Sequence, residues 1–201
     1  MDSHLKDVFD FVFNSGYSLK NGGCIKSNPL VQCVTRTFPA SISQIILPYM
    51  ESCKIIGCAG HGSWSRVMYV AILDNTENRD LNGFSVSKGI FPEFLISNSC
   101  HRIYLVYMLG VGTKSDREIM RMVKHLRSKI NYTSFSDCTS ELELGEYKEK
   151  YAKAVLFYKS YLAHQEYSNE ELAADLNMLM DIHYKQGLPN YKKYNQRDSF
   201  D

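Results

Sequence analysis

A histidine between two glycines, followed by the only tryptophan, is the grouping in this sequence best suited to contact a ligand: Gly60-His61-Gly62-Ser63-Trp64. Glycine tolerates positive φ and lets a backbone approach another molecule closely, so we expect His61 to project from a tip between two strands. Such a tip can insert into a binding partner. An exposed hairpin end at which the histidine has no function would show the same sequence pattern. Trp64 is more typical of a buried core residue than of a surface on which a base stacks.

Two other patterns suggest nucleotide chemistry or nucleophilic catalysis, but neither meets its requirements. Residues 110–115 are similar in composition to a phosphate-binding loop, yet the G-x-x-x-x-G-K-[ST] pattern would need glycine where Met108 and Thr113 stand. Cys100 and His101 are adjacent, and adjacent side chains on a strand point to opposite faces. We therefore expect neither a nucleotide-hydrolysing motor nor a cysteine nucleophile on this chain.

A metal-dependent nuclease site is the remaining catalytic possibility. Its carboxylates and lysine would have to come from a polar loop and the strand after it: Asp74, Glu77, Lys88 and Glu93. These residues lack the compact spacing that holds a metal and a nucleophile together, so we do not expect hydrolysis.

The cysteines indicate neither zinc nor disulfides. No C-x-x-C pair or finger-like histidine spacing occurs among the six, so they are expected to be reduced thiols, several of them buried: Cys24, Cys33, Cys53, Cys58, Cys100 and Cys138. The sequence predicts no cofactor and no metal.

Composition indicates a folded protein without strong overall charge. Of 201 residues 44% are hydrophobic and 12% aromatic, whereas 23 Lys and Arg against 22 Asp and Glu leave a net charge of +1. A nucleic-acid ligand would therefore have to be held by local basic patches and specific pockets. No leader pattern and no apolar run of roughly 18 residues is present, so we expect a cytoplasmic protein without a membrane span.

The first third of the chain is predicted to be helical. Apolar residues recur at helical spacing from a Ser3 cap to about Gly16, Asn28-Pro29 reads as the cap and first turn of a second helix, and Pro39 is expected to open a third. Short β-prone runs follow at 53–58, 68–73, 90–96 and 102–109. Their connections are too short for crossover helices, which implies mostly antiparallel pairing.

The second half returns to helices. Residues 113–130 form an amphipathic helix with one basic face, and residues 74–88 and 131–145 are predicted to be polar connections. Residues 152–162 suit a strand or a helix, with aromatic and branched residues favouring the strand. The capping box Ser168-Asn169-Glu170-Glu171 starts a last helix. We predict an α+β fold with a curved, mostly antiparallel sheet flanked by N- and C-terminal helices, as one domain over 1–186 with a charged tail at 187–201.

Four sequence pieces, in order, resemble the N-terminal target-recognition domain of McrB-type modification-dependent restriction systems. They are Asn28-Pro29-Leu30; residues 59–64 leading into 69–73; residues 88–95 followed by 102–105 and the glycine turn 110–112; and residues 144–176 with the capping box. The resemblance covers roughly residues 28–186. It implies a non-enzymatic module that binds duplex DNA carrying a 5-methyl or related modified cytosine and flips that base out of the helix.

The resemblance also implies roles for individual residues. The tip of Gly60, His61, Gly62 and Ser63 would enter the duplex and occupy the vacated space. The flipped base would lie in a pocket walled by Tyr69, Phe91 and Leu95 and closed by the turn that ends at Thr113. Tyr69 stands where a tryptophan is common, and its hydroxyl would suit a larger or more polar substituent, such as hydroxymethyl.

Basic residues near these pieces are candidates for phosphate contacts: Arg66, Lys88, Lys114 and Arg117. The partners implied by the resemblance are modified DNA, a McrB-type GTPase motor and a McrC-type nuclease subunit. Two alternatives stay open, namely a protein-interaction or regulatory module on the same fold that reads no base, and a stand-alone nuclease.

Overall fold

The protein is described by a computed structural model that covers residues 4–15, 28–60, 65, 67–80, 83–97, 99–132, 134–144 and 148–187. Within these ranges a five-stranded sheet has the order β1-β2-β5-β6-β7. Its strands are β1 (Cys53–Cys58), β2 (Met68–Asp74), β5 (Ile90–Ile96), β6 (Arg102–Leu109) and β7 (Val155–Leu162). All four pairings are antiparallel, which confirms the predicted α+β class and strand direction.

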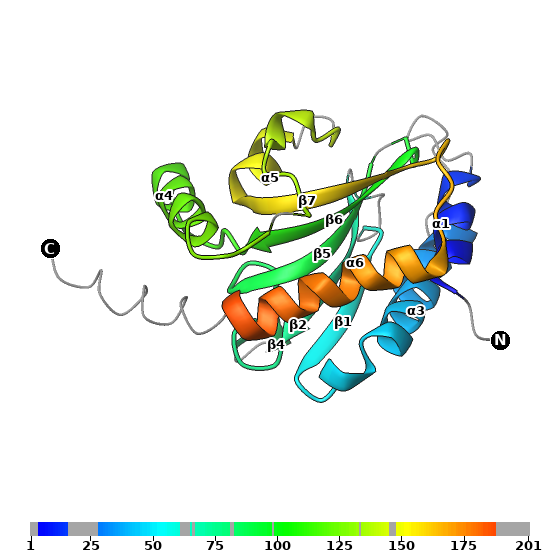
Figure 1. Cartoon of the computed structure of the whole chain (residues 1–201), viewed down its shortest axis with the longest axis horizontal. Coiled ribbons are helices and arrows are strands. Elements are labelled where there is room, and N and C mark those ends of the chain that lie inside the picture. The colour runs from blue at the N-terminus through cyan, green and yellow to red at the C-terminus, as the bar shows by residue number, and fades with distance from the viewer. Residues whose placement is uncertain are drawn as a thin grey trace, which may run out of the picture.

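Helices cover the two faces of the sheet unequally. The helices on one side are α1 (Leu5–Phe13), α3 (Phe38–Ile45) and α6 (Asn169–Asp181), whereas α5 (Lys148–Ala154) lies on the other side and α4 (Asp116–Arg127) lies beside the sheet (Figure 1). Short helical segments complete the described chain: α2 (Pro29–Gln32), η3 (Cys33–Thr37), η4 (Leu47–Tyr49), η5 (Thr139–Glu141) and η7 (Ile182–Gly187). None of the helices in these ranges is both long enough and apolar enough to cross a membrane.

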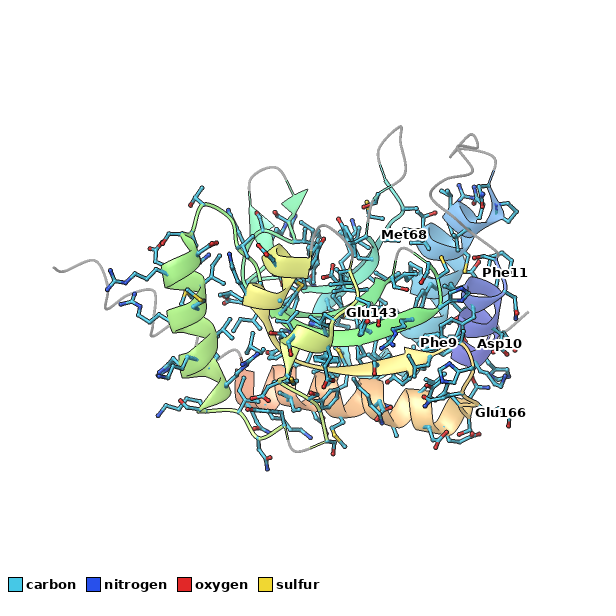
Figure 2. All side chains as sticks on the ribbon, turned by 90° about the horizontal axis from the view of Figure 1, so that it is seen from above. Phe9, Asp10, Phe11, Met68, Glu143 and Glu166 are labelled. Atoms are coloured by element: carbon cyan, nitrogen blue, oxygen red, sulfur yellow. The ribbon has the colours of Figure 1, made fainter. Side chains whose placement is uncertain are left out.

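Phe9 joins the N-terminal helix to the sheet. Its ring makes edge contacts with Phe38 on α3, Phe94 on β5 and Tyr161 on β7, at centroid distances of 5.7, 6.0 and 5.2 Å. Figure 2 shows Phe9 on the inner side of α1, while Phe11 lies on the outer side and is exposed. Aromatic pairs in this geometry stabilise a fold by more than the area they bury. This cluster therefore joins α1 and α3 to the sheet.

A buried carboxylate joins α6 to the same face. Asp175 accepts hydrogen bonds from the Tyr161 hydroxyl at 2.9 Å and from the Lys159 ammonium at 2.7 Å, both on β7. A buried charge that is paired and hydrogen-bonded avoids most of its desolvation cost, so these contacts offset the cost of burying the Asp175 side chain.

Several element boundaries differ from the sequence predictions. The helix expected to open at Pro39 is instead continuous with the preceding one through the π-helical turn η3, which widens the helix just before a proline that cannot donate a hydrogen bond. Residues 152–154 belong to α5, so the strand begins only at Val155. The amphipathic helix is α4, shorter at both ends than predicted, and Ser115 and Glu118 form a capping box at its start.

The connection between β2 and β5 also contains more structure than expected. It includes a small hairpin of β3 (Arg79–Asp80) and β4 (Gly83–Phe84), where Gly83 has a φ of 111°. The first helix ends at Phe13 with Asn14 as its C-cap, earlier than the predicted end near Gly16, and its N-cap is His4 and not the predicted Ser3. Most of the charged tail lies outside the described residues. The described part of α1 is capped by His4 and Asp7.

Gly57 is predicted to be essential for seating β1 against η3. A Cβ atom at this position would lie 1.9 Å from the Val34 carbonyl oxygen, which is backbone and cannot move aside as a side chain could. We expect Gly57→Ala to lower the free energy of unfolding by roughly 3 kcal/mol, in the upper range for overpacked sites. The exposed Glu51→Ala substitution is the control and should change it by about 0.5 kcal/mol or less. Equal denaturation midpoints in urea for the two variants would contradict the proposed contact.

Candidate base-binding cavity

A cavity of about 270 Å³ lies on the face of the sheet opposite α1, α3 and α6. Its walls come from three strands, from α5, and from the segments that precede β5 and follow β6. The lining residues are Tyr69, Val86, Ser87, Phe91, Glu93, Met108, Val111, Gly112, Tyr151 and Ala154. Ligand pockets for drug-sized molecules run from roughly 300 to 1,000 Å³, so this hollow suits a smaller, single-ring group.

Strand register places the lining residues. Side chains alternate between the two faces of a strand, so Phe91, Glu93 and Leu95 share the cavity face of β5, while Phe94 faces the helices. Tyr69 on β2 pairs with Leu95, and Phe91 is four positions further along β5. At about 3.3 Å per residue the Tyr69 and Phe91 backbones are about 13 Å apart along the sheet, with Glu93 between them.

Two close backbone contacts shape the cavity wall beyond β6. The Gly110 amide donates to the Gly89 carbonyl at 2.8 Å, and a Cβ at Gly110 would lie 2.4 Å from the Lys88 nitrogen. Gly112 has a φ of 46°, and a Cβ there would lie 2.9 Å from the Ser87 carbonyl oxygen. The glycines of this turn let it pack directly on the segment before β5, which brings Val111 and Ser87 to the same hollow.

Glu93 is the only ionisable carboxyl in the cavity lining, and it is 2% exposed. Burial away from water disfavours the charged form and raises the pKa of this carboxyl to about 8. The other two buried carboxylates in the described residues have partners, because Asp175 binds Tyr161 and Asp74 accepts from the Thr76 hydroxyl at 2.6 Å. Glu93 has no hydrogen bond or ion pair to any described residue.

Tyr69 is half-buried at one end of the cavity. Burial, the neighbouring Cys58 thiol on β1 and the Glu93 carboxyl all raise the pKa of its hydroxyl, with burial contributing most. Tyr69 therefore stays neutral and keeps a hydroxyl donor at physiological pH. Its ring and that of Tyr151, from α5, both line the hollow.

The residues predicted from the resemblance are only partly brought together. Tyr69 and Phe91 line the same cavity, but Leu95 is fully buried outside its lining, and Thr113 is exposed just beyond the lining residues Val111 and Gly112. Gly60 has a φ of 128°, a conformation that favours glycine, at the start of the predicted tip. His61, Gly62, Ser63, Trp64 and Arg66 lie outside the described residues.

None of the predicted phosphate-binding residues that are described belongs to the cavity lining, although Lys88 and Lys114 adjoin lining segments in sequence. Lys88 is exposed and follows the lining residue Ser87, and Arg117 is exposed on α4. Lys114 is half-buried, its ammonium donates to the Gly110 carbonyl at 3.2 Å, and burial lowers its pKa. The ammonium group carries three donors, so this bond leaves capacity for an anion.

The nuclease arrangement is not assembled. Asp74 and Glu93 occupy opposite faces of the sheet, since Glu93 shares a face with Tyr69 and Asp74 is an odd number of positions from Tyr69 on β2. The Asp74 carboxylate accepts from the Thr76 and Glu77 amides at 2.7 and 3.0 Å, which shapes the turn after β2. Within the described ranges no three His, Cys, Asp or Glu residues are placed to hold a metal ion.

Sequence reasoning assigned no place in the pocket to three informative lining residues: Glu93, which was considered only for a nuclease site, Met108 and Tyr151. Glu93 carried a usable signal, because it alternates with Phe91 on one predicted strand. Met108 on β6 pairs with Phe91 on β5, which the structure shows but the sequence alone does not. Tyr151 carried none, since it lies just before the segment 152–162 and was assigned to no helix or strand.

Comparison with known protein families gives one match. Residues 13–187 match the family described as MrcB-like, N-terminal domain. The match spans the cavity, all five strands of the sheet and most of the helices. No curated protein and no solved structure matches the chain.

The unpartnered carboxyl makes fold stability depend on pH. Burial raises the folded-state pKa of Glu93 to about 8, whereas an ordinary glutamate titrates near 4.5. The contribution of the protonated Glu93 to the free energy of unfolding is therefore fully present below pH 4.5 and is lost as pH rises towards 8. Glu93→Gln removes this dependence. We expect the free energy of unfolding of the variant, relative to the parent, to increase by on the order of 3 kcal/mol between pH 4.5 and pH 8.

Urea denaturation at several pH values measures this difference. The subtraction cancels other titrating groups, such as buried His183, whose pKa is lowered to about 4 mainly by burial. Parallel curves for the parent and the variant would show that Glu93 ionises freely in the folded protein.

Proposed function

Because this chain belongs to the MrcB-like N-terminal domain family, we propose that it binds duplex DNA containing a modified cytosine and holds that base, flipped out of the helix, in the cavity beside Tyr69 and Phe91. The observation that carries the proposal is a hollow of single-ring size whose lining combines three aromatic rings with few polar groups. Apolar pockets with a small number of placed polar groups are typical of small-ligand sites.

Energetics favour such a pocket for an extruded base. Flipping costs a few kcal/mol of unstacking and unpairing, which stacking on aromatic or apolar side chains and hydrogen bonds to the base edge can offset. Tyr69, Phe91 and Tyr151 supply rings, and Met108 supplies a polarisable surface. A methyl substituent adds only about 0.8 kcal/mol when buried, so contact with the methyl alone gives a modest preference for modified DNA.

Binding outside the pocket is assigned to the tip and to local cations. His61, with Gly60, Gly62 and Ser63, would fill the space that the base leaves, and Arg66, Lys88, Lys114 and Arg117 would contact phosphates. A net charge of +1 gives little general attraction for DNA, so these contacts would set the position and the salt dependence of binding. Thr113 and Leu95 would not contact the base directly. They would support the lining residues, Thr113 through the turn that follows β6 and Leu95 through β5.

In the cell, the domain would supply target specificity without catalysis. The motor and the cleavage would come from a McrB-type GTPase and a McrC-type nuclease subunit, and the site of action would be the cytoplasm. The alternative of a protein-interaction module rests on the same fold and predicts no dependence on DNA modification.

Binding to matched duplexes tests the proposal. Two fluorescent duplexes of identical sequence, one carrying a single 5-methyl- or 5-hydroxymethylcytosine, are titrated with the protein at two salt concentrations. We expect tighter binding to a modified duplex, by about fourfold for a methyl group, and weaker binding to both duplexes at higher salt. Equal affinity for every duplex would favour the interaction module, and cleavage with Mg²⁺ would favour a nuclease.

Side-chain truncation separates the pocket from the tip. Tyr69→Ala should weaken binding to modified DNA by about tenfold or more, since stacking on one ring contributes roughly 1–3 kcal/mol. His61→Ala should weaken binding as well, through the unfilled space in the duplex. Tyr167→Ala, a half-buried ring that contacts Tyr161 on the opposite face of the sheet, is the matched control and should bind as the parent does. Unchanged affinity in Tyr69→Ala and His61→Ala, with folding confirmed by circular dichroism, would refute these roles.

A further inference from the structure

Glu93 occupies the floor of the cavity, and its carboxyl makes no hydrogen bond to a described residue although the hydroxyls of Tyr69, Ser87 and Tyr151 line the same hollow. Its strand partners are Ala71 on β2 and Val106 on β6, both apolar and fully buried. Neither strand partner can form a side-chain hydrogen bond with the carboxyl, so the carboxyl can hydrogen-bond to a molecule that enters the hollow. A buried polar group without a partner costs folding free energy, so its position here requires an explanation other than stability.

The groups that face Glu93 do not favour its charged form. Seven titratable residues lie on its side of the sheet: Lys54 and Cys58 on β1, Tyr69 on β2, Arg102 and Tyr104 on β6, Tyr158 on β7 and Tyr151 on α5. The two cations lie outside the cavity lining, where the Lys54 ammonium lies over the Phe84 ring and Arg102 pairs with Glu143. The described lining itself contains no Lys, Arg or His.

The two lysines that adjoin the lining residues Ser87 and Gly112 in sequence are not part of the lining either. Lys88 is exposed, and the Lys114 ammonium bonds to the Gly110 carbonyl. Desolvation is accordingly the one cause that raises the Glu93 pKa to about 8.

A neutral carboxyl presents one O–H donor beside one acceptor oxygen. Cytosine presents the complementary pair on its Watson–Crick edge, with N3 as acceptor and the N4 amino group as donor. An ionised carboxylate would instead place a second acceptor against the N3 lone pair. We propose that Glu93, in its protonated form, makes this pair of hydrogen bonds to the flipped cytosine and so selects the base edge that enters the cavity.

This inference rests on the proposed function and assigns a division of labour within the same site. With N3 and N4 directed at the floor, the substituent on C5 points to the side walls. Glu93 would recognise the base edge whether or not the base is modified, and the aromatic and apolar walls would respond to the modification.

Affinity measured across pH distinguishes Glu93 from a structural residue. The parent, binding a duplex with one modified cytosine, should lose about tenfold in affinity between pH 7 and pH 9, because the protonated fraction of a group with a pKa of about 8 falls by that factor. Glu93→Gln carries an amide with the same donor and acceptor pair, so it should bind at pH 7 within about threefold of the parent and lose the pH dependence. Glu93→Leu keeps an apolar side chain without either group and should bind at least tenfold more weakly at pH 7.

Two controls isolate the effect. Glu149→Gln removes one negative charge from an exposed position on α5 and should keep the parent's pH profile. A duplex with an abasic site in place of the modified cytosine offers no base edge, so its binding to the parent should not change over this pH range.

The outcomes separate this inference from the proposed function. Parallel pH profiles for the parent and Glu93→Gln, or unchanged affinity in Glu93→Leu, would overturn the role of Glu93 while a preference for modified DNA persists. If the parent binds modified and unmodified duplexes equally at pH 7, both the proposed function and the role of Glu93 that rests on it are overturned.

Discussion

The central strand β5 is buried on both faces, and this constraint determines where the site can be. Every residue from Ile90 to Ile96 is buried, so each alternate side chain must be covered by a different layer. Phe94 and its alternates lie beneath α1 and α3, whereas Phe91 and Glu93 lie beneath α5 and the turn at Gly112. A one-residue slip of β5 would exchange the two sets, so the register with β2 and β6 positions the cavity.

The two layers differ in how well they are filled. On the helical side, aromatic rings from α1, α3, β5 and β7 interlock, and the buried Asp175 is fully partnered. On the other side, α5 has only seven residues and leaves a hollow over the sheet. An unfilled cavity costs stability roughly in proportion to its volume, so the well-packed helical layer is what allows the protein to keep an open site opposite.

Local signals predicted much of this fold from the sequence. Asn28-Pro29, the capping box at Ser168 and the alternating β-prone runs identify helix starts and strands because each depends on residues close in the chain. The boundary at Val155 and the turn η3 could not be predicted in this way. They depend on how α5 and the preceding helix pack, and packing against distant elements overrides a local preference.

The site was less predictable than the fold. Tyr69 and Phe91 were identified through a family resemblance, and the structure places them around one hollow, but Leu95 proved to be supporting core rather than lining. Glu93 had been weighed only as part of a nuclease set with Asp74, Glu77 and Lys88. Its significance depends on two facts that a sequence does not state, the depth of its burial and the apolar character of Ala71 and Val106 on either side.

Burial of Glu93 carries opposite consequences for stability and for recognition. A leucine there would relieve the desolvation of the carboxyl and stabilise the fold, as at other functional sites where stability and function compete. The same desolvation keeps the carboxyl neutral near pH 7, and only the neutral form offers a donor to N3 of cytosine. Adding a lysine nearby would ionise the carboxyl and remove that donor. The absence of cations from the described lining is therefore part of the chemistry we assign to the site, as the aromatic walls are.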